Sequence, residues 1–428
     1  MRQNHSFSDR LRQRVVNLLK WPASPAALQL LGGRVDAGRK AGSDAQASLS
    51  FWEAKRVLVI RLDEIGDVVL TTPLLRELRR NLPRAWITLV VKKQVYNLVV
   101  NCPYVNEVLS FDWQAPSWRF YYTLLWRAWG LARRHLRPRR FDLALVPRWG
   151  YGEYYFAKPL AFLSGARDRI GFAEQCSNPA IGESATDRLL TRVLHHKELR
   201  HEARRSLDML EYLGCTVQGE SLDLWLTPQE QEEVRQRLAR LGLGPGELLI
   251  TLAPGASKPG RQWPINRFSE LGAWLIRTYG GRLLVVGGLG DEPLGHTLAQ
   301  TLGDGVINLT GQTTLRQTAA LISFSQLFVG NDSGPMHLAA AGGVPVVEIS
   351  SFPHLGHPLH PRSPCRFGPW GVPHRILQPA GLTPPCTEPC LAAEPHCILE
   401  VAVARVQGAV AELLAATWKN PQVYRGTA

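Results

Sequence analysis

The sequence predicts an α/β protein built from two doubly wound domains in tandem. From residue 56 onward, short apolar segments alternate with amphipathic ones, as strands and helices do around a parallel sheet covered on both faces. The alternation stops in a polar region and restarts after Leu-Gly-Leu-Gly-Pro-Gly at residues 241–246. The length of 428 residues also exceeds what one hydrophobic core usually fills. We therefore expect one domain at residues 51–240 and a second at 241–428.

The first domain begins with a short buried strand at residues 57–62 and a helix at 68–81. Further strands are expected at 87–91, 108–111 and 141–146. A basic, tryptophan-rich segment at 113–140 predicts a half-buried helix, with membrane-interface contact or a wall for an acceptor as alternatives. Thr227 and Pro228 mark the start of a charged helix that leads to the junction.

The second domain repeats the pattern, with strands expected at 248–252, 283–286, 306–309, 327–329 and 344–349. A final helix at about 399–418 is expected to pack back across the first domain.

Residues 1–50 differ from the rest of the chain. Apolar residues form one helical stripe among arginines, followed by a segment rich in Ala, Gly and Ser. This basic N-terminal extension fits a helix lying on a membrane surface or a flexible, solvated tail, and the two stay open. The sequence shows neither an apolar stretch long enough to span a membrane nor a secretory signal, so we expect a cytoplasmic protein. Peripheral contact with the inner membrane is an alternative.

Composition narrows the partners. The net charge of +13 favours anionic ligands such as nucleic acid, anionic lipid or phosphorylated sugar, but no nucleic-acid-binding motif is present. The seven cysteines are an odd number and, without a signal peptide, are expected to be reduced thiols.

The turn after the first strand, within residues 61–73, faces the ligand edge of the sheet. Gly66 would permit close backbone approach, and Asp67 could accept a proton from a hydroxyl group. Asp67 could equally cap the following helix, and spacing alone favours that role.

Two further turns follow strands of the second domain. In residues 253–264, Ser257, Lys258 and Arg261 are suited to bind phosphate oxygens. In residues 286–293, a glycine turn is followed by two acids, of which Glu292 is the expected ribose contact and Asp291 the competitor.

The strongest turn lies within residues 329–347, where a strand leads into a helix of small residues. Backbone N–H groups at the helix start favour a phosphate near Asp332, Ser333 and Gly334. Pro335 suits the first helical position, and His337 lies one turn further on, where we expect it to face the same ligand.

A cysteine-rich segment near the C-terminus holds Cys386, Cys390, His396 and Cys397. These residues are a weak candidate for zinc, because adjacent His and Cys ligands and this spacing are unusual. Free thiols are the favoured interpretation, so no metal and no cofactor is expected.

Taken together, these segments resemble glycosyltransferase family 9, the ADP-heptose:lipopolysaccharide heptosyltransferases and their relatives. The strongest motifs are Ile-Arg-Leu-Asp-Glu-Ile-Gly-Asp-Val-Val-Leu-Thr-Thr-Pro, Gly-Ala-Arg-Asp-Arg-Ile-Gly-Phe at 165–172, and Gly-Asn-Asp-Ser-Gly-Pro-Met-His-Leu-Ala-Ala-Ala. The resemblance implies the GT-B architecture, in which two Rossmann-like domains face a cleft, with the donor in the C-terminal one. It also implies an inverting reaction without a catalytic metal.

The resemblance assigns roles to residues. Asp67 matches the family's general base, which overrides the capping preference, and Arg261 replaces a basic residue that is usually Lys. The matches to the donor-sugar and diphosphate turn are Asp332, Ser333, Gly334 and His337, and Gly66 and Arg148 are expected on the acceptor side.

The expected function is therefore transfer of a heptose or related sugar from a nucleotide-diphosphate donor to a lipopolysaccharide core or related surface glycan. ADP-heptose is the favoured donor, and an anionic glycolipid is the favoured acceptor. Residues 350–370 depart from the family pattern beside the nucleotide site. The alternatives are another GT-B nucleotide-sugar enzyme, such as an epimerase, and a catalytically silent glycan- or nucleotide-binding protein.

Overall fold

The structure, a computed structural model, describes residues 51–112, 114, 120–148, 156–176, 186–195, 198–244, 246–360, 362–386, 390 and 392–418. It divides into two compact units. The first comprises Met1–Glu64, Leu74–Glu198 and Arg205–Gln218, and the second comprises Ile65–Pro73, Leu199–Arg204 and Gly219–Ala428. The predictions for residues 1–50 lie outside the described residues, and the domain boundary expected at 240 and 241 stays a prediction.

The first unit contains a six-stranded parallel sheet in the order β3-β2-β1-β4-β5-β6. Its strands are β1 (Arg56–Arg61), β2 (Trp86–Lys92), β3 (Glu107–Phe111), β4 (Leu143–Val146), β5 (Asp168–Phe172) and β6 (Arg192–Leu194). This is the strand order of the Rossmann fold, whose ligand edge lies between the first and fourth strands.

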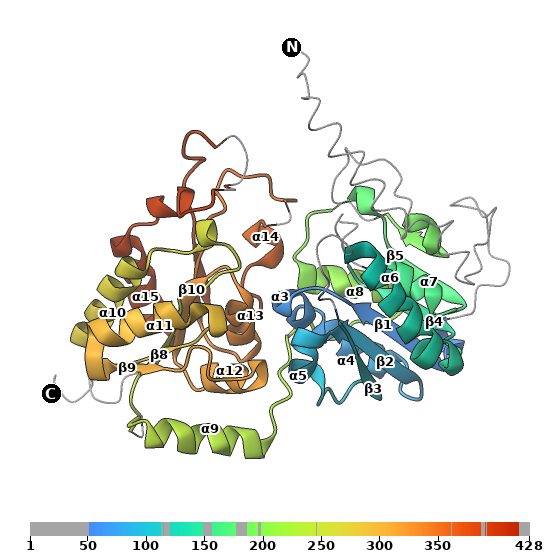
Figure 1. Ribbon diagram of the computed structural model, residues 1–428, viewed down its shortest axis with the longest axis horizontal. Helices are drawn as coiled ribbons and strands as arrows, with labels where there is room; N and C mark the ends of the chain where they lie inside the picture. The colour runs from blue at the N-terminus through green and yellow to red at the C-terminus, as the bar shows by residue number, and fades with distance from the viewer. Residues whose placement is uncertain are drawn as a thin grey trace, which may run out of the picture. The chain divides into compact units, whose positions relative to one another are not determined.

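Helices cover this sheet: α4 (Thr72–Asn81), α5 (Tyr96–Val99), α6 (Phe120–Leu131), α7 (Ala157–Leu163) and α8 (Glu202–Tyr212). Side chains alternate along a strand, so Leu58 and Ile60 of β1 share one face and pack in one cluster with Leu124 of α6 and Leu160 of α7. Figure 1 shows α6 and α7 side by side beside β4 and β5. Because α6 also exposes 62% of Trp126, the half-buried helix expected in the tryptophan-rich segment is confirmed for its described part.

The helix expected at 68–81 is divided into α3 (Ile65–Val69) and α4. Pro73 lacks the N–H group that would bond to the carbonyl of Val69, and the hydroxyl of Thr72 donates to that carbonyl instead, at 2.8 Å. α3 belongs to the second unit, whereas most of α4 belongs to the first.

The second unit contains a parallel sheet in the order β12-β11-β10-β7-β8-β9. Its strands are β7 (Leu249–Ala253), β8 (Arg282–Val285), β9 (Val306–Asn308), β10 (Leu327–Asn331), β11 (Val346–Ile349) and β12 (His374–Leu377). Counted within the unit, this is again the Rossmann order. The two sheets confirm the predicted α/β class.

The helices of the second unit include α9 (Pro228–Arg240), α10 (Ile265–Tyr279), α11 (Glu292–Leu302), α12 (Leu315–Ile322), α13 (Gly334–Ala341), α14 (Pro364–Phe367) and α15 (Val403–Thr417). α9 begins where predicted, because Thr227 and Glu230 form a reciprocal capping box. In Figure 1, α9 runs alongside α12.

The final helix packs within the second unit, and its expected packing across the first domain stays a prediction. α15 lies against α10 and strands β10 to β12 of the second unit. Its apolar residues, including Val406 and Val410, are buried in one cluster with Leu271 of α10 and Val347 of β11. The amphipathic stripe of this helix therefore closes the core of the second sheet.

Three strands were missing from the sequence-based assignment: β5, which lies between β4 and β6, and the edge strands β6 and β12. Their sequences, Asp-Arg-Ile-Gly-Phe, Arg-Val-Leu and His-Arg-Ile-Leu, mix charged with apolar residues and give a weak strand signal. Among the described residues, no helix is both long and apolar enough to span a membrane.

Candidate active site

A cavity opens where the strand order of the second sheet reverses, between β7 and β10. Its volume is about 340 Å³, within the usual range of ligand pockets. Gly255 and Ser257 after β7, Asp291 after β8, Thr313 before α12 and Ser333 before α13 contribute to its wall. Doubly wound sheets bind their ligands at this reversal point, so this cavity is the candidate nucleotide site.

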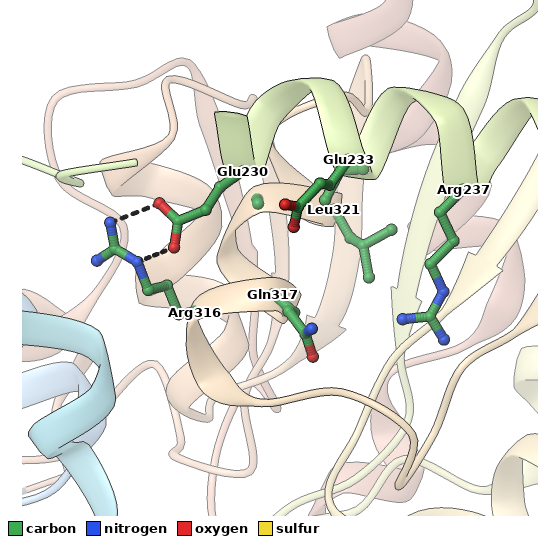
Figure 2. A pocket seen from close by; sticks show the side chains of 8 residues that line it. Glu230, Glu233, Arg237, Arg316, Gln317 and Leu321 are labelled. Atoms are coloured by element: carbon green, nitrogen blue, oxygen red, sulfur yellow. Dashed lines mark hydrogen bonds and ion pairs between the residues drawn. The ribbon is translucent and has the colours of Figure 1, made fainter. Parts of the chain in front are cut away.

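A second, smaller cavity lies between α9 and α12. Figure 2 shows the carboxylate of Glu230 and the guanidinium of Arg316 facing each other at its edge. Its volume of about 60 Å³ has room for a few waters and not for a nucleotide.

The loop after β7 carries a basic side chain toward the turn after β10. Arg261 donates from Nη2 to the backbone carbonyl of Asp332 at 3.0 Å and forms a 2.5 Å ion pair with its carboxylate. Its Nη1 atom lies 3.3 Å from the hydroxyl oxygen of Ser257 in the cavity wall. Lys258, by contrast, is exposed and does not line the cavity. Ser257, Arg261 and Asp332 are therefore joined at the cavity, as their predicted phosphate roles require.

Asn331 holds these two segments in register. Its side chain is fully buried, donates from Nδ2 to the carbonyl of Pro254 at 2.7 Å, and accepts from the N–H of Trp263 at 3.0 Å. These bonds fix both ends of the 254–263 loop against the end of β10. The sequence analysis assigned Asn331 no such role, although an amide at the end of an apolar strand was a visible signal.

No side chain caps the start of α13, so its backbone N–H groups are available to an anion. Ser333 occupies the N-cap position, but its hydroxyl donates to the carbonyl of Asn331 at 3.1 Å and does not cap the helix. Pro335 lies in the first turn, as predicted. The positive end of the helix dipole thus points to the cavity wall formed by Ser333 and Pro335.

His337 packs differently from the expectation. Its ring is buried against Gly66, where an added Cβ would come closer to the ring atoms than the 3.0 Å that real Cβ atoms tolerate. Burial lowers the pKa of His337 to about 4, although the carboxylate of Asp332 opposes the shift. His337 is therefore neutral near pH 7, and it directly fixes the approach of α3 to α13. The sequence-based ligand contact stays a prediction.

Asp67 is the third residue of α3 and is half-buried. Since the helix begins at Ile65, Asp67 does not occupy the N-cap position that its spacing favoured. Its backbone carbonyl accepts from the hydroxyl of Thr71 at 2.7 Å, which stabilises the end of this short helix. Gly66 and Asp67 thus lie in the second unit, on the helix that packs against α13.

Arg148 lies at the corresponding reversal point of the first sheet. It pairs with Asp63, which follows β1 and also lies 3.3 Å from the guanidinium of Arg61. Burial opposes ionisation of Asp63, but the charges of Arg148 and Arg61 outweigh it and hold its pKa below the usual value. The sequence analysis had not singled out Asp63, which here fixes the predicted acceptor-side arginine.

Of the two acids after β8, only Asp291 lines the cavity, and the ribose contact expected of Glu292 stays a prediction. Asp291 lines the cavity and accepts from the N–H of Gly288 at 2.9 Å. Glu292 is absent from the cavity wall, and its carboxylate lies against Gly311, where an added Cβ would collide with it. The reason is local: Glu292 begins α11, and its longer side chain extends toward the loop after β9.

Glu348 is a buried acid that the sequence analysis missed. It lies on β11 with 0% exposure, and neither carboxylate oxygen has a hydrogen-bond partner. Burial, with the charge of Asp332, raises the pKa of Glu348 well above its ordinary value, while Arg261 opposes the shift. A glutamate within the apolar run Val-Pro-Val-Val-Glu-Ile was the available signal.

Comparison with known proteins agrees with this architecture. The family model for glycosyltransferase family 9 (heptosyltransferase) matches residues 160–357. A lipopolysaccharide heptosyltransferase 2 from Salmonella typhimurium is 25% identical over 318 residues, which cover 71% of this chain and 85% of that protein. The chain is therefore similar to glycosyltransferase family 9 over these residues.

Two solved structures extend the family 9 likeness to the fold. A family 9 glycosyltransferase from Veillonella parvula superimposes with a TM-score of 0.71 at 22% identity, over 87% of this chain and all of that one. The ADP-heptose lipopolysaccharide heptosyltransferase II of Escherichia coli gives 0.64 at 22% identity, over 84% and 99%. The two superpositions show the GT-B fold. The matches to the family model and to the Salmonella protein support a glycosyltransferase.

Proposed function

We propose that this glycosyltransferase moves a heptose, with inversion, from ADP-heptose to a lipopolysaccharide core or a related surface glycan. The observation that carries the proposal is the cavity where the strand order reverses between β7 and β10. It is large enough for a nucleotide, Arg261 lies beside its wall, and no side chain caps the start of α13. The names of the Salmonella and Escherichia coli relatives support heptose and lipopolysaccharide as the substrate classes.

Each part of the donor has a plausible partner in this site. Asp291 is placed to accept hydrogen bonds from the ribose hydroxyls. The diphosphate would lie toward Ser257, Ser333 and the helix start, with Arg261 supplying positive charge. These are the groups that would stabilise the negative charge that grows on the departing ADP.

Asp67 is the proposed general base. It would take the proton of an acceptor hydroxyl while the oxygen forms a bond to the anomeric carbon. The bond from that carbon to the phosphate oxygen breaks, and ADP leaves with the electron pair. Attack from the face opposite the leaving group inverts the anomeric centre. Asp67 takes the proton, and Arg261 with the start of α13 stabilises the negative charge on ADP. We therefore propose that the transfer step uses no metal.

The acceptor is proposed to be anionic. Three basic side chains lie after or at the ends of β1, β2 and β4: Arg61, Lys92 and Arg148. Together with the net charge of +13 they favour a phosphorylated or acidic glycolipid. A nucleotide-sugar donor and a lipid-held acceptor would meet at the cytoplasmic face of the inner membrane, which is where we place the reaction.

The test is transfer by the purified protein from a panel of nucleotide sugars to core-glycan acceptors, followed by mass spectrometry and by anomeric coupling in NMR spectra. Asp67→Asn should lower kcat by roughly 10²- to 10⁴-fold with little change in donor binding. The matched control is Asp304→Asn, an exposed aspartate in a turn before β9, which should keep full activity.

Full activity of Asp67→Asn would refute its role as base. A released, epimerised sugar nucleotide would point to the epimerase alternative, and tight binding without turnover to a silent binding protein. Activity that survives a chelator would support the metal-independent transfer step.

A further inference from the structure

Four side chains with metal-ligating atoms converge in the segment between β12 and α15. We name them the Cys–His cluster: Cys386, Cys390, His396 and Cys397. Their ligand atoms all lie within 4.8 Å of one another, although the four residues span positions 386 to 397 of the sequence. Cys390 and Cys397 are buried, and the other two are partly exposed.

The distances within the cluster match a tetrahedral site. The Nδ1 atom of His396 lies 3.5 Å from the sulfurs of Cys386 and Cys397 and 3.8 Å from that of Cys390. Zinc bonds of about 2.3 Å to sulfur and about 2.05 Å to nitrogen place nitrogen and sulfur about 3.6 Å apart at the corners of a tetrahedron. We propose that the Cys–His cluster binds one zinc ion, with three sulfurs and one nitrogen as ligands.

The alternative of plain thiols explains the arrangement less well. A neutral imidazole nitrogen forms one hydrogen bond, yet three sulfurs surround Nδ1 of His396. A cation at the centre gives all four atoms a partner at once. The neighbouring positions of His396 and Cys397 are compatible, because the chain turns into a 3-10 helix, Cys397–Glu400, at that point.

Charge and packing around the cluster support the same assignment. Three thiolates and one Zn²⁺ ion leave one negative charge, and the guanidinium of Arg362 donates to the carbonyl of Cys390 at 3.0 Å. The segment also presses on Gly260, where an added Cβ would collide with the carbonyl of Ala392. Gly260 belongs to the 3-10 helix Pro259–Arg261, so the cluster lies against the turn that carries Arg261.

The residues that follow the cluster are anchored to the same turn. The carbonyl of Val401 accepts from Trp263 Nε1 at 2.7 Å and from Arg267 Nη1 at 2.9 Å. Glu400 accepts from the hydroxyl of Thr383 at 2.8 Å, which joins the two ends of the segment. Four protein ligands leave no open position for substrate, so the zinc would be structural and would hold this segment on the Arg261 turn.

The experiment measures metal in the full-length protein, purified without chelators and free of any affinity tag. Elemental analysis should find about one zinc per chain. Metal-stripped protein titrated with Co²⁺ should develop the visible bands of tetrahedral cobalt and the near-ultraviolet charge-transfer band of sulfur ligands. Cys397→Ser should lose most of the zinc, whereas Cys365→Ser, which removes an exposed cysteine outside the cluster, should keep it.

Three results would overturn the proposal: wild-type protein that holds far less than one zinc per chain and gives no tetrahedral cobalt spectrum, equal loss of metal in the Cys365→Ser variant, or a disulfide within the cluster of protein kept reduced. Iron at a one-to-one ratio would overturn the choice of zinc. The cobalt titration uses the wild-type chain, so the outcome does not depend on whether Cys397→Ser folds. None of these readouts depends on the proposed transfer activity.

Discussion

The wall of the candidate nucleotide cavity can be tested by a single added methyl group. In Gly255→Ala the new Cβ would lie well inside the 3.0 Å limit from the carboxylate of Asp291. This carboxylate is the end of a side chain that can rotate, so we expect it to move away from the cavity wall. The movement breaks its 2.9 Å hydrogen bond from the N–H of Gly288.

The expected loss of stability in Gly255→Ala follows from the loss of the hydrogen bond between Gly288 and Asp291. A hydrogen bond to a charged group contributes about 1.5–3 kcal/mol, and Asp291 is only half-buried, so the free energy of unfolding should fall by about 1–2 kcal/mol. If Asp291 contacts the ribose, loss of about 1.4 kcal/mol of binding would raise the Kd for ADP about 10-fold. Calorimetric titration of ADP measures this Kd without requiring turnover.

The control is Gly290→Ala, in the same turn as Asp291 but with no atom within 4 Å of the added Cβ. Its ADP affinity should match that of the wild type. Asp291→Ala alone should weaken ADP by a similar factor, and the double variant Gly255→Ala with Asp291→Ala should be no weaker than either single one. An unchanged Kd for Gly255→Ala, or additive effects in the double variant, would refute the reasoning.

Three further predictions concern buried charges. The hydrogen bond from Arg316 holds the pKa of Glu230 at about 2, so Glu230→Gln should lower stability by about 1–2 kcal/mol at pH 7, after allowance for its partial exposure. This difference in the free energy of unfolding between the wild type and the variant should shrink as the pH falls below 4.5. Unfolding curves at pH 7 and pH 3 would test this, and an equal difference at both pH values would contradict it. Arg366→Met removes the ion pair that Arg366 forms with the buried carboxylate of Glu202 and should cost about 3–5 kcal/mol, with recovery in the double variant with Glu202→Leu. The raised pKa of Glu348 means that rising pH destabilises the wild type, so Glu348→Gln should raise Tm at pH 8 and lose this advantage toward pH 4.

The central strands were predictable because both faces of each are buried. In a parallel sheet this gives short continuous apolar runs, such as Leu249–Ala253, which glycine turns separate clearly. Two edge strands, β6 and β12, were not predicted; β6, for example, has only three residues, and one of them is Arg192. The packing of α15 against the second sheet was not predicted for a different reason. An amphipathic stripe shows which face of a helix is buried and not which core it joins.

In the candidate site, too, some features could be predicted from the sequence and others could not. The turns at the carboxyl ends of strands drew attention to Ser257 and Ser333, which line one cavity, and to Arg261, whose Nη1 atom lies 3.3 Å from the Ser257 hydroxyl. Their ligand contacts stay predictions. The sequence could not tell which of Asp291 and Glu292 lines the cavity, because the two adjacent residues differ in the direction that the helix start gives their side chains. The Cys–His cluster was judged from spacing, which cannot reveal that an irregular segment brings four ligand atoms within 4.8 Å.

The charges beside the cavity explain how Arg261 can serve an anionic donor although it is already paired. Its ion pair with Asp332 keeps the guanidinium in place, while Nη1 remains directed toward Ser257 and the cavity wall. A diphosphate would add negative charge next to Asp332, which repulsion alone would disfavour. Burial raises the pKa of Glu348 well above its ordinary value, which disfavours a third negative charge in the same region. The dipole of α13 adds positive potential on the other side of Asp332. We therefore expect donor binding to compete only partly with the Arg261–Asp332 pair. Asp332→Asn should accordingly tighten binding of ADP while loosening the position of Arg261, and a weaker affinity for ADP in this variant would show that positioning outweighs charge.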